Sequence, residues 1–115
     1  MRYLCLVTMD PSITSKMTEA DWAVFQDGTR TFDDGLKAAG RFVTASPLDQ
    51  PGTARTLRQR KADLMVTDGP FTESKEYIAG FLIFEAADMA EAVGFAAKSP
   101  FTRVGSIEVR ALREY

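Results

Sequence analysis

Hydrophobic residues along the chain fall into six strand-like runs. They occupy positions 3–9, 41–46, 54–60, 64–68, 77–85 and 106–112. The last run alternates cleanly between apolar and polar residues, whereas 3–9 and 77–85 are apolar throughout, which predicts burial on both faces. Gly80 interrupts the most apolar run, and a glycine there indicates a β-bulge or a close backbone approach. Runs 54–60 and 64–68 lie close enough in sequence to form a hairpin around 61–63.

Two stretches show helical periodicity instead. The longer one is predicted to begin at Thr18, with Asp21 as the reciprocal partner of a capping box, and to stop at Gly40. The second is predicted to begin at Asp88, with Glu91 closing its capping box. Apolar stripes follow both helices. Their members are Trp22, Phe25, Thr29, Phe32, Leu36 and Ala39 in the first, and Met89, Ala92, Val93 and Ala96 in the second.

The order of these elements predicts one domain over residues 1–115. It is β-α-β-(hairpin)-β-α-β, the order of a ferredoxin-like α+β sandwich with an extra β-hairpin. Two helices can cover only one face of such a sheet. The other face would expose a large apolar patch, so we expect a homodimer in which the open sheet faces meet.

Composition narrows the function classes. The net charge is −2 and the isoelectric point about 5.1, so we expect no nucleic-acid partner. No apolar run approaches the length that spans a bilayer, and we expect no membrane association. Cys5 is the only cysteine. It lies in an apolar run, where we expect a buried thiol, and a lone cysteine fits a cytoplasmic protein.

The chain contains no histidine. Histidine is the commonest acid–base group near neutral pH and a ligand in most zinc and non-haem iron sites. We therefore expect neither a metal nor a cofactor. Acid–base chemistry in this chain must use carboxylates, tyrosine or lysine.

The segment 66–76 carries the most specific motif, Asp-Gly-Pro-Phe, at positions 68–71. Asp and Gly favour a turn, and Pro ends strand pairing. One interpretation is a rigid structural turn. The other is a carboxylate, Asp68, desolvated at the edge of a cleft and acting as a general base. In the second case the ligand-binding residues are predicted to be Trp22, Phe25, Thr67, Gly69, Pro70, Phe71 and Lys75.

This motif and the polar residues after it, including Glu73, Lys75 and Glu76, resemble the YCII-related family, in the branch named for Asp-Gly-Pro-Phe. The resemblance covers essentially the whole chain. It implies a dimeric α+β barrel. In the family at large a histidine and an aspartate are proposed to form the site, and the absence of histidine here leaves Asp68 with polar helpers.

Three functions follow as hypotheses. The first is a small organic molecule bound beside the motif, with cofactor-independent lyase, isomerase or hydrolase chemistry through Asp68. The second is a non-enzymatic interaction or ligand-sensing module, because members of the branch are found joined to sigma-factor domains, which implies a link to transcription initiation. The third is a purely structural motif.

Four cations in the hairpin suit either an anionic ligand or a charge-protected edge: Arg55, Arg58, Arg60 and Lys61.

Overall fold

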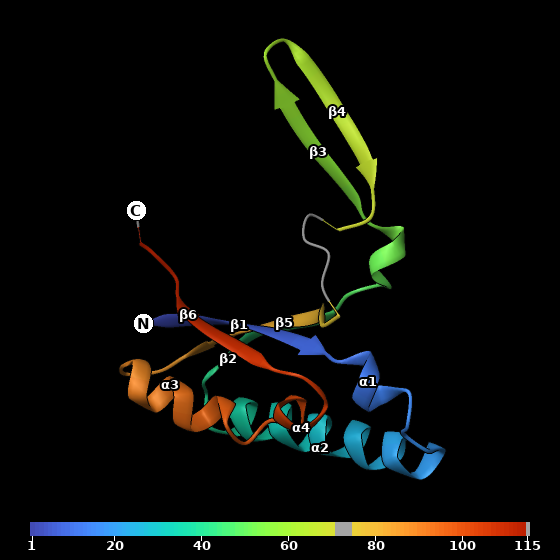
Figure 1. Cartoon of the computed structure of the whole chain (residues 1–115). Helices are drawn as coiled ribbons and strands as arrows, with labels where there is room; N and C mark the ends of the chain where they lie inside the picture. Colours follow the sequence, from blue (N-terminus) through green and yellow to red (C-terminus); the bar gives the residue numbers. More distant parts are fainter. Residues whose placement is uncertain (71–74, 115) are drawn as a thin grey trace.

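A computed structural model describes residues 1–70 and 75–114 of the chain. Figure 1 shows a sheet with helices on one face and a hairpin that projects from the other side. The strands are β1 (Arg2–Met9), β2 (Phe42–Pro47), β3 (Arg55–Arg60), β4 (Asp63–Asp68), β5 (Tyr77–Glu85) and β6 (Ile107–Ala111). The helices are α1 (Pro11–Thr14), α2 (Glu19–Ala38), the 3₁₀ turn η1 (Pro51–Thr53), α3 (Met89–Ala96) and α4 (Phe101–Val104).

The main sheet has the strand order β2-β5-β1-β6, and all its neighbours are antiparallel. This is the order of a ferredoxin-like α+β fold, so that part of the predicted fold class is confirmed, and the dimeric barrel stays a prediction. The second sheet is the predicted hairpin of β3 and β4. The short elements α1, η1 and α4 were not predicted, because each is too short to show a hydrophobic period.

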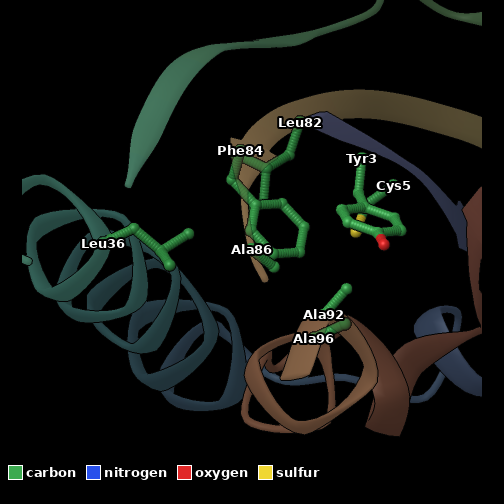
Figure 2. Close-up of a cluster of buried hydrophobic side chains, with 8 residues drawn as sticks. All are labelled: Tyr3, Cys5, Leu36, Leu82, Phe84, Ala86, Ala92 and Ala96. Atoms are coloured by element: carbon green, nitrogen blue, oxygen red, sulfur yellow. The ribbon is translucent and has the colours of Figure 1, made fainter. Parts of the chain in front are cut away.

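The core lies between the sheet and the helices, as Figure 2 shows. Phe84 of β5 is fully buried, and its ring meets that of Tyr3 on β1 at a centroid separation of 6.4 Å. Cys5 is buried beside them as a free thiol, as predicted. Burial raises the pKa of this thiol to about 11, so it stays protonated and unreactive at neutral pH.

The predicted capping box of α2 is present. The Thr18 hydroxyl accepts from the Asp21 N–H at 3.1 Å, and the Asp21 carboxylate accepts from the Thr18 N–H at 2.9 Å. Gly40, with φ +71°, follows the helix end. Among the helix residues only Leu36 is fully buried. Within the described residues no helix is both long enough and apolar enough to cross a membrane.

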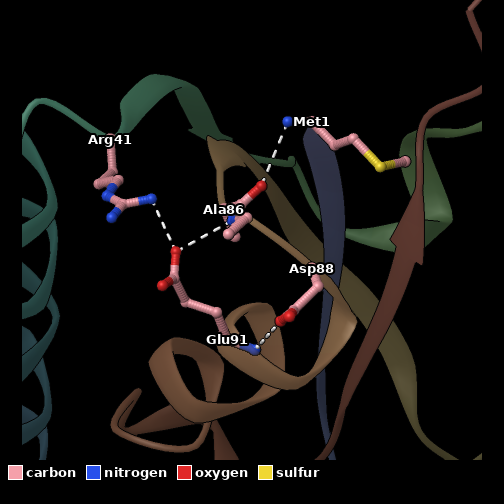
Figure 3. Close-up of polar contacts among 6 residues, drawn as sticks. Met1, Arg41, Ala86, Asp88 and Glu91 are labelled. Atoms are coloured by element: carbon pink, nitrogen blue, oxygen red, sulfur yellow. Dashed lines mark hydrogen bonds and ion pairs between the residues drawn. The ribbon is translucent and has the colours of Figure 1, made fainter.

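The start of α3 differs from the prediction in one bond. Asp88 caps the helix by accepting from the Glu91 N–H at 2.8 Å. Glu91, however, does not return this bond to Asp88: its Oε1 accepts from the Ala87 N–H at 3.0 Å and from Arg41 at 2.7 Å (Figure 3). The nearby cation competes for the carboxylate and ties the helix to the residue before β2. The buried stripe is also narrower than predicted, because Met89 and Val93 are exposed.

Gly80 serves both roles that the sequence indicated. The pairing of β1 with β5 shifts register beside it, since Val7 faces Gly80 and Thr8 faces Ile78. Strand β2 also passes very close: a Cβ atom at Gly80 would lie 2.8 Å from the Ser46 carbonyl oxygen. A backbone atom cannot give way as a flexible side chain can.

The hairpin of β3 and β4 is packed less closely against the rest of the protein than the main sheet is. Every residue of β4 is exposed, and Leu57, Leu64 and Val66 keep about 60% of their surface accessible. Cross-strand pairing places Leu57 beside Val66 and Gln59 beside Leu64, so these apolar side chains share one face. A two-stranded hairpin without such packing is only marginally stable.

We expect Gly80→Ala to lower the free energy of unfolding by about 1–3 kcal/mol, the usual cost of overpacking a tight site. Gly52→Ala is the matched control, since no atom lies within 4 Å of the position that its Cβ would take. Urea unfolding of both variants measures the difference. Equal stability of the two variants would contradict the close approach.

Candidate functional site

The motif turn is fixed by backbone geometry. Gly69 has φ +96°, a conformation that favours glycine. Its N–H donates to the Ala54 carbonyl at 2.8 Å, and its carbonyl accepts from the Thr56 hydroxyl at 2.8 Å. The Gly69–Pro70 bond is trans. The turn is thus anchored to the base of β3.

A cleft of about 940 Å³, which we call the motif cleft, lies where the hairpin joins the main sheet. It is bounded by the ends of β1 and β5, the start of α1, the η1 region and part of the motif segment. The motif segment contributes Pro70 and Lys75, which were both predicted to bind a ligand. The other lining residues are Thr8, Pro11, Leu48, Asp49, Gln50, Pro51, Thr53, Ala54, Glu76, Tyr77 and Ile78.

Glu76 lies in this cleft, and a residue beside the end of another strand holds its carboxylate by a hydrogen bond. It is half-buried, and the Ser106 hydroxyl donates to its Oε2 at 3.3 Å. Ser106 is in turn bonded to Thr8: the two hydroxyl oxygens lie 2.7 Å apart, and the Ser106 N–H donates to the Thr8 hydroxyl at 2.9 Å. This chain of bonds fixes the carboxylate over the sheet.

Two other ionisable groups flank Glu76. Lys75 precedes it and is exposed, and Tyr77 follows it, with its hydroxyl 3.6 Å from the Met9 sulfur. The charge of Lys75 also affects Asp10, whose side chain caps the N-terminus of α1. Hydrogen bonds from Ser12 lower the pKa of Asp10, and the nearby Lys75 charge lowers that pKa further. The cleft therefore contains the carboxylates of Asp49 and Glu76, a phenol and an ammonium group.

Asp68 is placed differently from the prediction. Its side chain is 86% exposed and pairs with the Arg55 Nε at 3.1 Å. It does not line the cleft, and the desolvation that was expected to make it a base is not present. The physical reason is that β4 has no layer packed on it, so the residues beside Asp68 remain in solvent.

The other predicted residues divide between the two faces of the sheet. Trp22 and Phe25 lie on α2, where Phe25 packs edge-on against Phe101 with ring centroids 5.0 Å apart. They do not line the motif cleft, because the sheet separates α2 from the hairpin (Figure 1). Thr67 is exposed and pairs with Thr56 in the hairpin. Gly69 shapes the turn without lining the cleft. Phe71 and Glu73 lie outside the described residues.

Thr8 and Ser106 were missed by sequence reasoning. They are 98 positions apart and meet only because β6 pairs with β1. Each is a small polar residue at a strand end, a pattern too common to single out. Glu76 had a detectable signal, since it follows the motif directly.

With the geometry described, comparison with known proteins identifies the family. The model of the YCII-related domain matches residues 1–115. The chain belongs to the YCII-related family. An uncharacterised protein of Rhizobium meliloti (strain 1021) is 35% identical over 120 residues, covering 100% of this chain and 94% of the relative.

A solved structure shares the fold of this YCII-related protein. It is 5-chloro-2-hydroxyhydroquinone dehydrochlorinase (TftG) from Burkholderia phenoliruptrix AC1100, in complex with 2,5-dihydroxybenzoquinone. The TM-score is 0.52 with 21% identity, and the match covers 100% of this chain and 96% of the other. At this identity the match supports the ferredoxin-like architecture and nothing about chemistry.

Proposed function

We propose that this protein binds a small organic molecule in the motif cleft and transfers a proton through Glu76, without a metal or cofactor. The observation that carries the proposal is the half-buried Glu76 carboxylate, held by Ser106 in a cleft of about 940 Å³. In a chain without histidine, a positioned carboxylate is a suitable general base.

The neighbouring groups suit the same chemistry. Glu76 would accept a proton from a C–H group adjacent to a carbonyl of the ligand. The Lys75 ammonium would stabilise the negative charge that develops on the carbonyl oxygen. Return of the proton to another atom completes an isomerisation, and loss of a leaving group completes a lyase reaction. Apolar residues such as Leu48 and Ile78 offer a wall for the carbon skeleton.

The solved structure that shares the fold suggests a class of ligand to test. The dehydrochlorinase acts, by its name, on a hydroxylated and chlorinated six-carbon ring, and a dihydroxybenzoquinone occupies its structure. A fold that accommodates a hydroxylated ring in one protein supports testing such rings here, although function follows the site and not the fold.

A second candidate function is that of a protein-interaction module. The exposed apolar residues Leu57, Leu64 and Val66 on one hairpin face favour it. Under this hypothesis the partner is a protein, such as a component of sigma-factor-dependent transcription initiation, and the motif serves only to hold the hairpin. A pull-down that recovers no sigma factor or polymerase subunit would contradict that partner. The same hypothesis predicts that Glu76→Gln has no effect on ligand binding.

We further propose a homodimer through the open sheet face. Helices cover one face only (Figure 1), and Leu4, Leu6, Phe81 and Ile83 alternate with the buried residues toward the other. Opposite charges flank this face in the pairs Arg2–Glu85 and Arg110–Glu108. A two-fold axis makes such a surface self-complementary.

The proton-transfer proposal predicts that Glu76→Gln removes ligand binding or turnover selectively. A thermal-shift screen of small hydroxylated aromatic and enolic compounds should give a ligand that raises the melting temperature of the wild type. Because a hydrogen bond to a charged group contributes about 1.5–3 kcal/mol, its affinity should fall at least roughly tenfold in Glu76→Gln.

Asp68→Asn is the matched control, because Asp68 carries the same charge nearby but lies outside the cleft. It should retain the ligand. Stabilisation that survives in Glu76→Gln but is lost in Asp68→Asn would overturn the role of Glu76 and restore the motif aspartate as the functional group.

The dimer proposal predicts that the wild type sediments at twice the 12.7 kDa mass of one chain at micromolar concentration. Leu6→Lys should dissociate it, since a lysine would place a charge within the apolar interface. Val24→Lys is the control, because Val24 is 68% exposed on α2. A monomeric wild type would refute the proposal.

A further inference from the structure

A groove of about 500 Å³ lies within the helix layer, between α2 on one side and α3 and α4 on the other. We call it the helix groove. It shares no lining residue with the motif cleft. Gly28 and Ala39 mark its two ends along α2, which at a helical rise of about 1.5 Å per residue lie about 16 Å apart. Thr31, Gly35 and Ala39 are exposed, so the groove is open to solvent along α2.

Two glycines of α2 line this groove for different reasons. A Cβ atom at Gly28 would lie 2.9 Å from Cγ of Pro100, so α2 meets the start of α4 there and the groove closes. At Gly35 no atom lies within 4 Å of the position that a Cβ atom would take. A glycine inside a helix destabilises it relative to alanine, and no such close contact explains Gly35. Its missing side chain leaves open space in the middle of the groove.

The end of the groove near Ala39 is apolar. Leu36 is buried there, and Phe95 of α3 lies opposite. The Arg41 guanidinium, just past the end of α2, lies 5.5 Å from the centre of the Phe95 ring, which places this ring at the Ala39 end. Arg41 already pairs with Glu91 at 2.7 Å, so its charge is compensated.

The end near Gly28 is cationic. Lys98 and Arg103 line the groove and flank Pro100 in the sequence, and Pro100 contacts Gly28. Both cations are exposed, and neither forms an ion pair with any residue that the structure describes. No acidic side chain is among the described residues that line the groove. The groove thus joins an apolar end to an end with uncompensated positive charge.

We propose that the helix groove binds a free aliphatic carboxylate of medium chain length. Lys98 and Arg103 hold the carboxylate group, and the alkyl chain lies along α2 over Gly35 toward Leu36 and Phe95. This site is additional to the motif cleft and does not depend on the proton transfer proposed there.

Shape and charge together favour this ligand. Lysine and arginine donate charge-assisted hydrogen bonds to a carboxylate, which are stronger than bonds between neutral groups. A single ring would fill only part of a groove about 16 Å long, whereas an extended alkyl chain can follow it. Each methylene group removed from water adds to the binding free energy. Binding should therefore need both the charge and the chain.

The test titrates octanoate, octan-1-ol and acetate into the ¹⁵N-labelled full chain, below the concentration at which octanoate forms micelles. Octanoate should shift the amides of Gly35, Phe95 and Lys98 saturably, because these residues line the groove. Octan-1-ol has the same chain without the charge, so it should bind at least roughly tenfold more weakly. Acetate has the charge without the chain and should give no saturable shift.

A double variant tests the role of the two cations. Lys98→Gln with Arg103→Gln should bind octanoate no more tightly than octan-1-ol. The matched control is Arg30→Gln with Lys37→Gln, which removes the same two kinds of cation from exposed positions of α2 outside the groove. This control should keep the preference for octanoate.

A third variant tests the open space at Gly35. Gly35→Leu should abolish binding of octanoate and octan-1-ol without lowering the melting temperature, because leucine favours the helix and meets open space. Ala23→Leu is the control, since Ala23 is exposed on the same helix outside the groove, and it should bind both compounds.

Four results would overturn the proposal. They are absence of saturable octanoate shifts, equal affinity for octanoate and octan-1-ol in the wild type, an octanoate preference that survives loss of both Lys98 and Arg103, and unchanged binding in Gly35→Leu. Glu76→Gln should leave octanoate binding unchanged, so failure of the proton-transfer proposal and failure of this one are distinguishable.

Discussion

The packing of helices against a single face of the main sheet is the constraint on which the rest of the structure depends. Phe84 is fully buried in this layer, with Ala92 and Ala96 of α3 beneath the sheet (Figure 2). Small residues on the helix allow close approach to the large rings on the strands. This layer fixes β1 and β5 at the centre of the sheet, and Thr8, Glu76 and Tyr77 of the motif cleft lie at or beside the ends of these strands.

The motif lies at the boundary between this well-packed layer and an exposed hairpin. Gly69 and Thr56 tie the turn to the base of β3, whereas the residues further out keep most of their surface in solvent. Glu76 belongs to the packed side of this boundary through Ser106 and Thr8. Asp68 lies on the exposed side, where it pairs with Arg55.

Local signals predicted most of the fold correctly. The capping box of Thr18 and Asp21, the hairpin and the double role of Gly80 all depend on neighbouring residues or on backbone sterics, which the sequence displays directly. The exposure of Asp68 could not be predicted locally, because it depends on whether another layer packs over β4. The bond between Glu91 and Arg41 depends on tertiary structure in the same way. The Thr8–Ser106 contact came from strand pairing across nearly the whole chain, which no local pattern reveals.

Native-state amide hydrogen exchange tests most directly whether the helix–sheet layer provides most of the stability while the hairpin opens independently. The account predicts that amides of Cys5 and Leu82 exchange only through global unfolding. Amides of Leu57 and Val66 should exchange about 100-fold faster or more, because local opening of the hairpin exposes no core. Equal protection in the two regions would contradict the account, since the hairpin would then unfold only together with the sheet.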